Sequence, residues 1–102
     1  MTFYHGTSKE NWEKIQQEGF LYGRRHVTDE NGTPIKEVSR CTYLATELNE
    51  AKCYGEMVLQ VEYNPYKNRE NNNYIEGCWQ VRVYEPIPLS QIQLLNEGYK
   101  ND

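Results

Sequence analysis

The chain has 102 residues, enough for one domain, and a domain of this size buries only about two-thirds of its unfolded surface. Its formal net charge is −4, and 37% of its residues are hydrophobic, including nine tyrosines. The acidic balance disfavours a non-specific nucleic-acid coat, since binding to the phosphate backbone needs a basic surface. With so few aliphatic residues, large amphipathic rings must supply much of the core.

Cysteine spacing and hydropathy indicate the compartment. Cys41, Cys53 and Cys78 are odd in number and widely spaced, so neither a zinc site nor a disulfide framework is expected, and no metal is predicted. Reduced thiols of this kind are typical of cytoplasmic proteins. No apolar run resembles a signal peptide or a membrane span. We expect one soluble cytoplasmic domain over residues 1–102, with a flexible polar tail over residues 96–102.

The first predicted elements are a short strand and a helix. Residues 2–4 are typical of a strand. Ser8 is a good N-cap for the helix that follows, in which Trp12 and Ile15 form the apolar stripe and Gly19 marks the end. Between them the strand ends in His5, which alone would more often bond a neighbour than a ligand. The adjacent Gly6 lets a ligand approach the backbone.

Residues 20–40 show the least regular pattern. Residues 29–34 are dense in turn-forming types, which indicates either a hairpin tip or a mobile loop. Three arginines flank this turn: Arg24, Arg25 and Arg40. They form either a solvated face or a contact to a phosphate, for which a guanidinium fork is well suited.

A second strand and helix place two tyrosines in a fixed relation. Thr42–Ala45 is a β-branched and aromatic run, and Thr46 is a good N-cap behind it. Apolar residues then recur at helical spacing, at Leu48, Ala51 and Tyr54, and Gly55 is predicted to end the helix. Tyr43 on the strand and Tyr54 on the helix would therefore face one site.

The remaining pattern is mostly β. Residues 56–63 alternate as a strand, and residues 74–85 are predicted to form a longer β segment with a bulge or bend at Gly77. Its faces are Trp79, Val81 and Val83 on one side, and Gln80, Arg82 and Tyr84 on the other. Residues 90–95 are predicted to be a short last strand. This element order predicts an α+β domain with two short helices on a mostly antiparallel sheet.

Three motifs resemble the ADP-ribosyltransferase family, specifically its diphtheria-toxin and poly(ADP-ribose)-polymerase-like branch. The first is His5-Gly6-Thr7, and the second is Tyr43-Leu44-Ala45 with its helix to Tyr54. The third is residues 80–85 of the long β segment, which lead into Pro86-Ile87-Pro88 and a terminal Ile92. They occur in the family's order and span nearly the whole chain.

The resemblance implies a split β-sandwich that binds NAD in the cleft between its halves. His5 would hydrogen-bond a ribose hydroxyl of NAD. Within the motif His5-Gly6-Thr7, the backbone of Gly6 would hold the nicotinamide carboxamide. Tyr43 and Tyr54 would pack on the nicotinamide ring, a sandwich that suits a flat aromatic cation. Arg24 is the arginine that we expect at the pyrophosphate.

Gln80 departs from the family pattern, because active members usually place a glutamate at this position. A glutamine keeps the hydrogen-bond geometry but lacks the negative charge, and preorganised groups of this kind are worth about 10²–10³ in rate. Three other acids are candidates to replace it: Glu62, Glu76 and Glu85. None of them is better placed by the pattern than Gln80.

The resemblance therefore implies a small NAD-dependent ADP-ribosyltransferase that modifies a protein or nucleic acid, with His5, Tyr43 and Gln80 as catalytic residues. Relatives include toxins and other effectors. Two alternatives stay open. One is a catalytically weak module that binds NAD or ADP-ribose, and the other is an RNA 2′-phosphotransferase-like enzyme, which would need a defined set of arginines and histidines.

Overall fold

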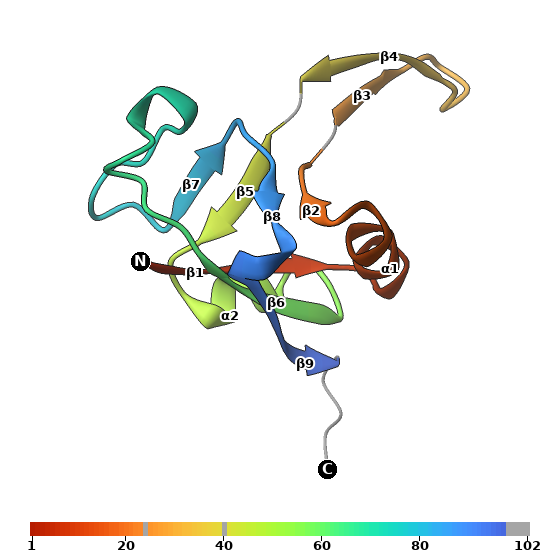
Figure 1. Ribbon diagram of the computed structural model, residues 1–102. Coiled ribbons are helices and arrows are strands. Elements are labelled where there is room, and N and C mark those ends of the chain that lie inside the picture. Colours follow the sequence, from red (N-terminus) through yellow and green to blue (C-terminus); the bar gives the residue numbers. More distant parts are fainter. Residues whose placement is uncertain (24, 40, 98–102) are drawn as a thin grey trace.

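A five-stranded antiparallel sheet forms the centre of the molecule (Figure 1). The structure, a computed structural model, describes residues 1–23, 25–39 and 41–97. The strand order is β7-β5-β1-β6-β9. The strands are β1 (Thr2–Thr7), β5 (Thr42–Ala45), β6 (Met57–Glu62), β7 (Gln80–Val83) and β9 (Ile92–Glu97). The three strands that carry the sequence motifs, β1, β5 and β7, are therefore neighbours in the sheet.

Two small ribbons lie beside this sheet. One pairs β2 (Phe20–Leu21) with β8 (Ile87–Pro88), and the other pairs β3 (Arg25–Thr28) with β4 (Pro34–Ser39). In the turn between β3 and β4, the Asp29 carboxylate accepts hydrogen bonds from the N–H groups of Asn31 and Thr33. The turn-rich stretch is thus a hairpin tip, and the β3–β4 ribbon projects from the rest of the chain in Figure 1.

Helix α1 (Lys9–Glu18) follows its local sequence signals closely. The Ser8 hydroxyl accepts a hydrogen bond from the Asn11 N–H at 3.1 Å, as an N-cap should. Gly19 adopts φ 85° and its N–H bonds the Ile15 carbonyl, which closes the helix. Trp12 and Ile15 are buried against the sheet. The predictions for this helix are confirmed.

Helix α2 (Leu48–Lys52) is shorter than its predicted form, and both predicted ends are wrong. Its N-cap is Glu47, because the Thr46 hydroxyl instead donates to the Trp79 carbonyl at 3.3 Å. Its C-cap is Cys53. Gly55 lies further on, where an added Cβ would clash with the Thr7 backbone. Gly55 therefore permits a close chain approach and does not end the helix.

Three strand boundaries also differ from the predictions. His5-Gly6-Thr7 lies inside β1, where it pairs with β6, and does not follow the strand. The segment predicted over residues 74–85 is a strand only from Gln80, since Gly77 at φ 91° forms a turn in which the Cys78 N–H bonds the Ile75 carbonyl. At the other end, β9 continues to Glu97. Two short 3₁₀ turns, Arg69–Asn71 and Leu89–Gln91, complete the elements.

The core lies on one face of the sheet, against α1 and the β2–β8 ribbon. Its largest fully buried members are Phe3, Leu44, Leu59, Ile87, Val61, Val81 and Val83. A second, smaller cluster of Ala45, Ala51 and Val58 packs α2 on the sheet. The predicted α+β class, with two helices on a mostly antiparallel sheet, is confirmed. In the described part of the chain, no helix is long and apolar enough to cross a membrane.

Candidate functional site

The site forms where β1 and β5 separate. β1 pairs with β6 along its whole length, whereas its pairing with β5 is recorded at a single position, Tyr4 opposite Ala45. In Figure 1, β5 lies at an angle to β1 and approaches it at its C-terminal end. The His5 side chain bridges the gap, because its Nδ1 lies 2.8 Å from the Tyr43 carbonyl oxygen. A histidine nitrogen thus makes the connection that a regular ladder would make with backbone groups.

The hydrogen bond defines the chemical state of His5. A carbonyl only accepts, so Nδ1 carries the proton and donates to Tyr43. Burial lowers the pKa of His5 below its ordinary value of 6.5, and the bond to the Tyr43 carbonyl opposes this only in part. The ring is therefore neutral at physiological pH, with Nε2 as an acceptor. Such a nitrogen is suited to a ligand hydroxyl.

A cavity of about 330 Å³ opens at this gap. Five residues from the sequence motifs line it: His5, Gly6, Tyr43, Tyr54 and Gln80. Tyr4, Ala45, Ala51 and Trp79 complete the wall. We call this cavity the tyrosine pocket. Tyr43, Tyr54 and Trp79 keep 42%, 59% and 44% of their surface exposed, so broad aromatic faces are open to a ligand.

Two glycines hold α2 and Tyr54 against β1. A Cβ on Gly6 would clash with the Ala51 carbonyl and would approach the Tyr54 Cβ to 3.2 Å. Gly55, directly after Tyr54, lies equally close to the Thr7 backbone. The chain on both sides of Tyr54 thus touches β1 at positions where only glycine fits. The tyrosine ring is placed at the pocket by these backbone contacts.

Gln80 lies at the pocket opposite Ala45, with which it pairs across β5 and β7. Among the described residues, no carboxylate lines the tyrosine pocket. Glu62 accepts a hydrogen bond from Thr2 at 2.6 Å, and Glu76 lines a separate hollow. Glu85 accepts a bond from the buried Tyr63 hydroxyl at 3.0 Å. Burial, more than Glu85, raises the pKa of Tyr63 to about 12.

Arg82 lies next to the pocket on β7. It pairs with Tyr43 across the strands, and its guanidinium carbon is 5.7 Å from the centre of the Tyr43 ring. A cation at this distance from a ring is attracted by the π system. This contact orients Tyr43, and it also brings a positive charge to the rim of the site.

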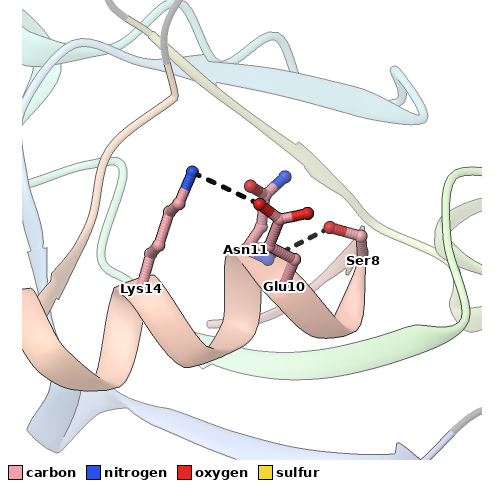
Figure 2. A network of polar contacts seen from close by, with 4 residues as sticks. All are labelled: Ser8, Glu10, Asn11 and Lys14. Carbon is pink, nitrogen blue, oxygen red and sulfur yellow. Dashed lines mark hydrogen bonds and ion pairs between the residues drawn. The ribbon is translucent and has the colours of Figure 1, made fainter.

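A second cavity of about 340 Å³ shares one lining residue, His5, with the first. Its polar lining comes from β1, from α1 and from the segment after α1: His5, Thr7, Asn11, Lys14, Glu18 and Tyr22. We call it the helix pocket. Figure 2 shows Lys14 and Asn11 on α1, with the Lys14 ammonium 3.8 Å from the Glu10 carboxylate. Both partners of that ion pair are well exposed, so the pair is weak and Lys14 remains available to a ligand.

The sequence-predicted residues are distributed over both cavities. Thr7 lines the helix pocket and does not reach the tyrosine pocket. Arg24 and Arg40 lie outside the described residues, so the predicted contact between Arg24 and a pyrophosphate stays a prediction. Within the described chain, no group of three metal-binding side chains is present.

Sequence reasoning missed Trp79 and the polar residues of α1. Trp79 was expected on the same face of a strand as Val81 and Val83, but it precedes the strand and its carbonyl accepts the Thr46 N–H at 2.8 Å. It lines the tyrosine pocket. Asn11, Lys14 and Glu18 recur at helical spacing, a pattern that could have revealed a polar helix face.

Comparison of the chain with family models, with curated proteins and with solved structures found no match. The function is therefore argued from the geometry of the two pockets.

Proposed function

We propose that this protein is a small NAD-dependent ADP-ribosyltransferase with the split β-sandwich of that family. One observation carries the proposal. Three motifs distant in sequence lie on adjacent strands, and their His5, Tyr43, Tyr54 and Gln80 surround a single pocket. The single pairing position between β1 and β5 supports a sheet that is split at the site.

The tyrosine pocket suits the nicotinamide half of NAD. The pyridinium ring is a flat cation, and Tyr43 and Tyr54 offer aromatic faces that attract one. The neutral His5 accepts a hydrogen bond from a ribose hydroxyl through Nε2. Because the Arg82 guanidinium already lies over the Tyr43 ring, that ring is only partly available to the nicotinamide. Tyr54 is therefore the main residue that stacks on it.

The helix pocket suits the ADP half. The two pockets share His5, so a dinucleotide whose ribose lies on His5 extends naturally from one into the other. Lys14 supplies a positive charge for the pyrophosphate, and Asn11 beside it supplies amide donors. Lys14 is thus the described residue that we propose at the pyrophosphate, and the predicted contact of Arg24 stays a prediction.

The reaction is a substitution at the anomeric carbon of the nicotinamide ribose. The bond between that carbon and the nicotinamide nitrogen breaks, and its electron pair leaves with neutral nicotinamide. A nucleophile of the acceptor then attacks the cationic sugar and loses its proton to solvent. The Gln80 amide oxygen can bond the ribose hydroxyl, but it supplies only a dipole where a carboxylate would supply a charge. Turnover is therefore slow.

The neutral Gln80 also favours a second candidate, a module that binds NAD or ADP-ribose without turning it over. The residues proposed to bind NAD line the tyrosine pocket, whereas no described carboxylate does, so the pocket lacks the charge that would stabilise the transition state. The RNA 2′-phosphotransferase-like alternative depends on a set of arginines of which Arg24 and Arg40 lie outside the described residues, so that alternative stays a prediction.

Incubation with NAD, followed by assay of free nicotinamide and titration of NAD binding, tests the proposal. We expect binding and slow release of nicotinamide. Tyr54→Ala should abolish binding by removing the stacking surface, whereas Tyr84→Ala, a matched exposed tyrosine that does not line the pocket, should leave it unchanged.

Binding without release of nicotinamide would favour the binding module. Absence of both would overturn the NAD assignment, and retained affinity in Tyr54→Ala would overturn the stacking role.

A further inference from the structure

The two edges of the five-stranded sheet differ in how the chain covers them. Residues 71–73 lie along the outer side of β7, where Asn72 forms a bridge with Val83 and the Asn73 N–H donates to the Arg82 carbonyl at 3.0 Å. The opposite edge is β9, at the other end of the sheet in Figure 1. In the described part of the chain, no strand pairs with the outer side of β9. That edge presents a row of backbone N–H and C=O groups to another chain.

The sequence of β9 does not protect this edge. Exposed edge strands usually carry a lysine, another charge or a proline, which prevents pairing with a second chain. Residues 92–96 contain no charged residue and no proline, and the only charge of the strand is its last residue, Glu97. Pairing with β6 is regular over Ile92–Leu94, and Leu95 beyond it is 41% exposed. The composition of β9 is therefore typical of a strand that pairs on both sides.

A hollow of about 700 Å³ lies beside the open edge. Leu94 of β9 lines it together with Met57 of β6 and Trp12 of α1. Its polar lining is Lys9, Glu13, Gln16 and Glu56. Side chains of paired strands alternate between the same two faces, so a strand added to β9 directs every second side chain to the face that holds this hollow. Backbone bonds at an edge and a pocket for alternate side chains are the two requirements of strand addition.

Charge and symmetry indicate a second copy of this chain as the occupant. When β9 pairs antiparallel with the β9 of another copy, no like charges meet across residues 92–96. The exposed Gln93 amide is both donor and acceptor, so it can bond an identical amide. Because residues 71–73 cover β7, β9 cannot add to the opposite edge of another sheet. The two β9 strands must meet each other, and this two-fold arrangement closes at two copies.

We propose that the protein forms a two-fold dimer through β9, in which the two five-stranded sheets join into one continuous antiparallel sheet. The dimer does not depend on the proposed function, because no residue of β9 lines the tyrosine pocket or the helix pocket. One pair of strands and the adjoining hollows make a smaller contact than a standard protein interface. The dissociation constant is therefore expected to be on the order of micromolar.

Sedimentation velocity over a range of protein concentrations tests the dimer. The mass of the wild type should rise from one chain to two as the concentration increases. Leu95→Lys should raise the dissociation constant by about tenfold or more, because position 95 is near the middle of β9, where the two copies bring like charges together. Leu48→Lys is the matched control, since Leu48 is an exposed leucine on α2, and this variant should dimerise as the wild type does.

Two further measurements separate lost contact from lost folding. A mixture of Leu95→Lys and Leu95→Glu should dimerise where neither variant does alone, an effect that misfolding cannot produce. Hydrogen exchange in β9 of the wild type should slow as the concentration rises, while exchange in β7 stays constant. The inference is overturned by a single-chain mass at every concentration, by growth beyond two chains, or by exchange in β9 that is independent of concentration. Unchanged dimerisation of Leu95→Lys, or a mixture that stays monomeric, also overturns it.

Discussion

His5 shows how one backbone contact prepares a residue for a ligand. Its bond to the Tyr43 carbonyl assigns the proton to Nδ1 and leaves Nε2 as an acceptor. Burial disfavours the charged ring. A protonated His5 would carry a donor on Nε2 and would repel the pyridinium, so both effects favour the state that the proposed ligand needs.

The lowered pKa of His5 predicts a pH dependence of stability. In the unfolded chain His5 takes up a proton near its ordinary pKa of 6.5, while the folded protein resists protonation to lower pH. The contribution of His5 is therefore present above that pKa and is lost as the pH falls through the folded value. Urea unfolding from about pH 8 to about pH 5 should show the wild type losing more free energy of unfolding than His5→Gln. If the free energy of unfolding fell with pH by the same amount in both proteins, this prediction would be wrong.

Gln80 allows a gain-of-function test. Gln80→Glu introduces a carboxylate at the pocket, and on the proposed function we expect release of nicotinamide from NAD to rise by about 10²-fold. Gln60→Glu is the control, because Gln60 is a half-buried strand residue on β6 that does not line the pocket. If Gln80→Glu still bound NAD but released nicotinamide at an unchanged rate, Gln80 would not lie where the proposed reaction needs a carboxylate.

At the scale of elements, the contact between β1 and α2 depends on glycine. Gly6→Ala would place a methyl group into the Ala51 carbonyl, so either the strand or the helix must move. We expect a loss of about 1–3 kcal/mol in the free energy of unfolding. We also expect weaker NAD binding, since Tyr54 moves with the helix. Thermal melts and NAD titration check both effects.

Ser90→Ala is the control for this change. Ser90 is exposed, and its replacement should alter stability by less than about 0.5 kcal/mol. If Gly6→Ala matched the control in both measurements, the close approach of α2 to β1 would not be what holds Tyr54 in place.

The elements also show why some predictions hold and others do not. Helix α1 was predictable because its signals are local: Ser8, the Trp12 and Ile15 stripe, and Gly19 are all within its own sequence. The start of α2 and the start of β7 adjoin the bond between Thr46 and Trp79, residues 33 positions apart. The local sequence of α2 or of β7 does not predict the contact between Thr46 and Trp79.

At the scale of the whole molecule, the motif residues of the candidate site were predictable from resemblance, but its shape was not. His5, Tyr43 and Gln80 were named from three short motifs, and the strand order brings them together. The helix pocket is lined by residues of β1, of α1 and of the segment after α1, and single-sequence patterns do not encode how these pack together. The α1 residues facing it were therefore missed.

The two pockets predict a ligand that spans the split in the sheet. NAD at about a hundredfold excess over its dissociation constant should raise the free energy of unfolding by about 2.7 kcal/mol. Hydrogen exchange shows where that stabilisation acts. ADP should slow exchange in α1 and residues 20–23, nicotinamide should slow it in β5 and α2, and NAD should slow it in both regions. If NAD slowed exchange in only one region, a single NAD molecule would not extend past His5 from one pocket into the other. The two cavities would then bind separate ligands.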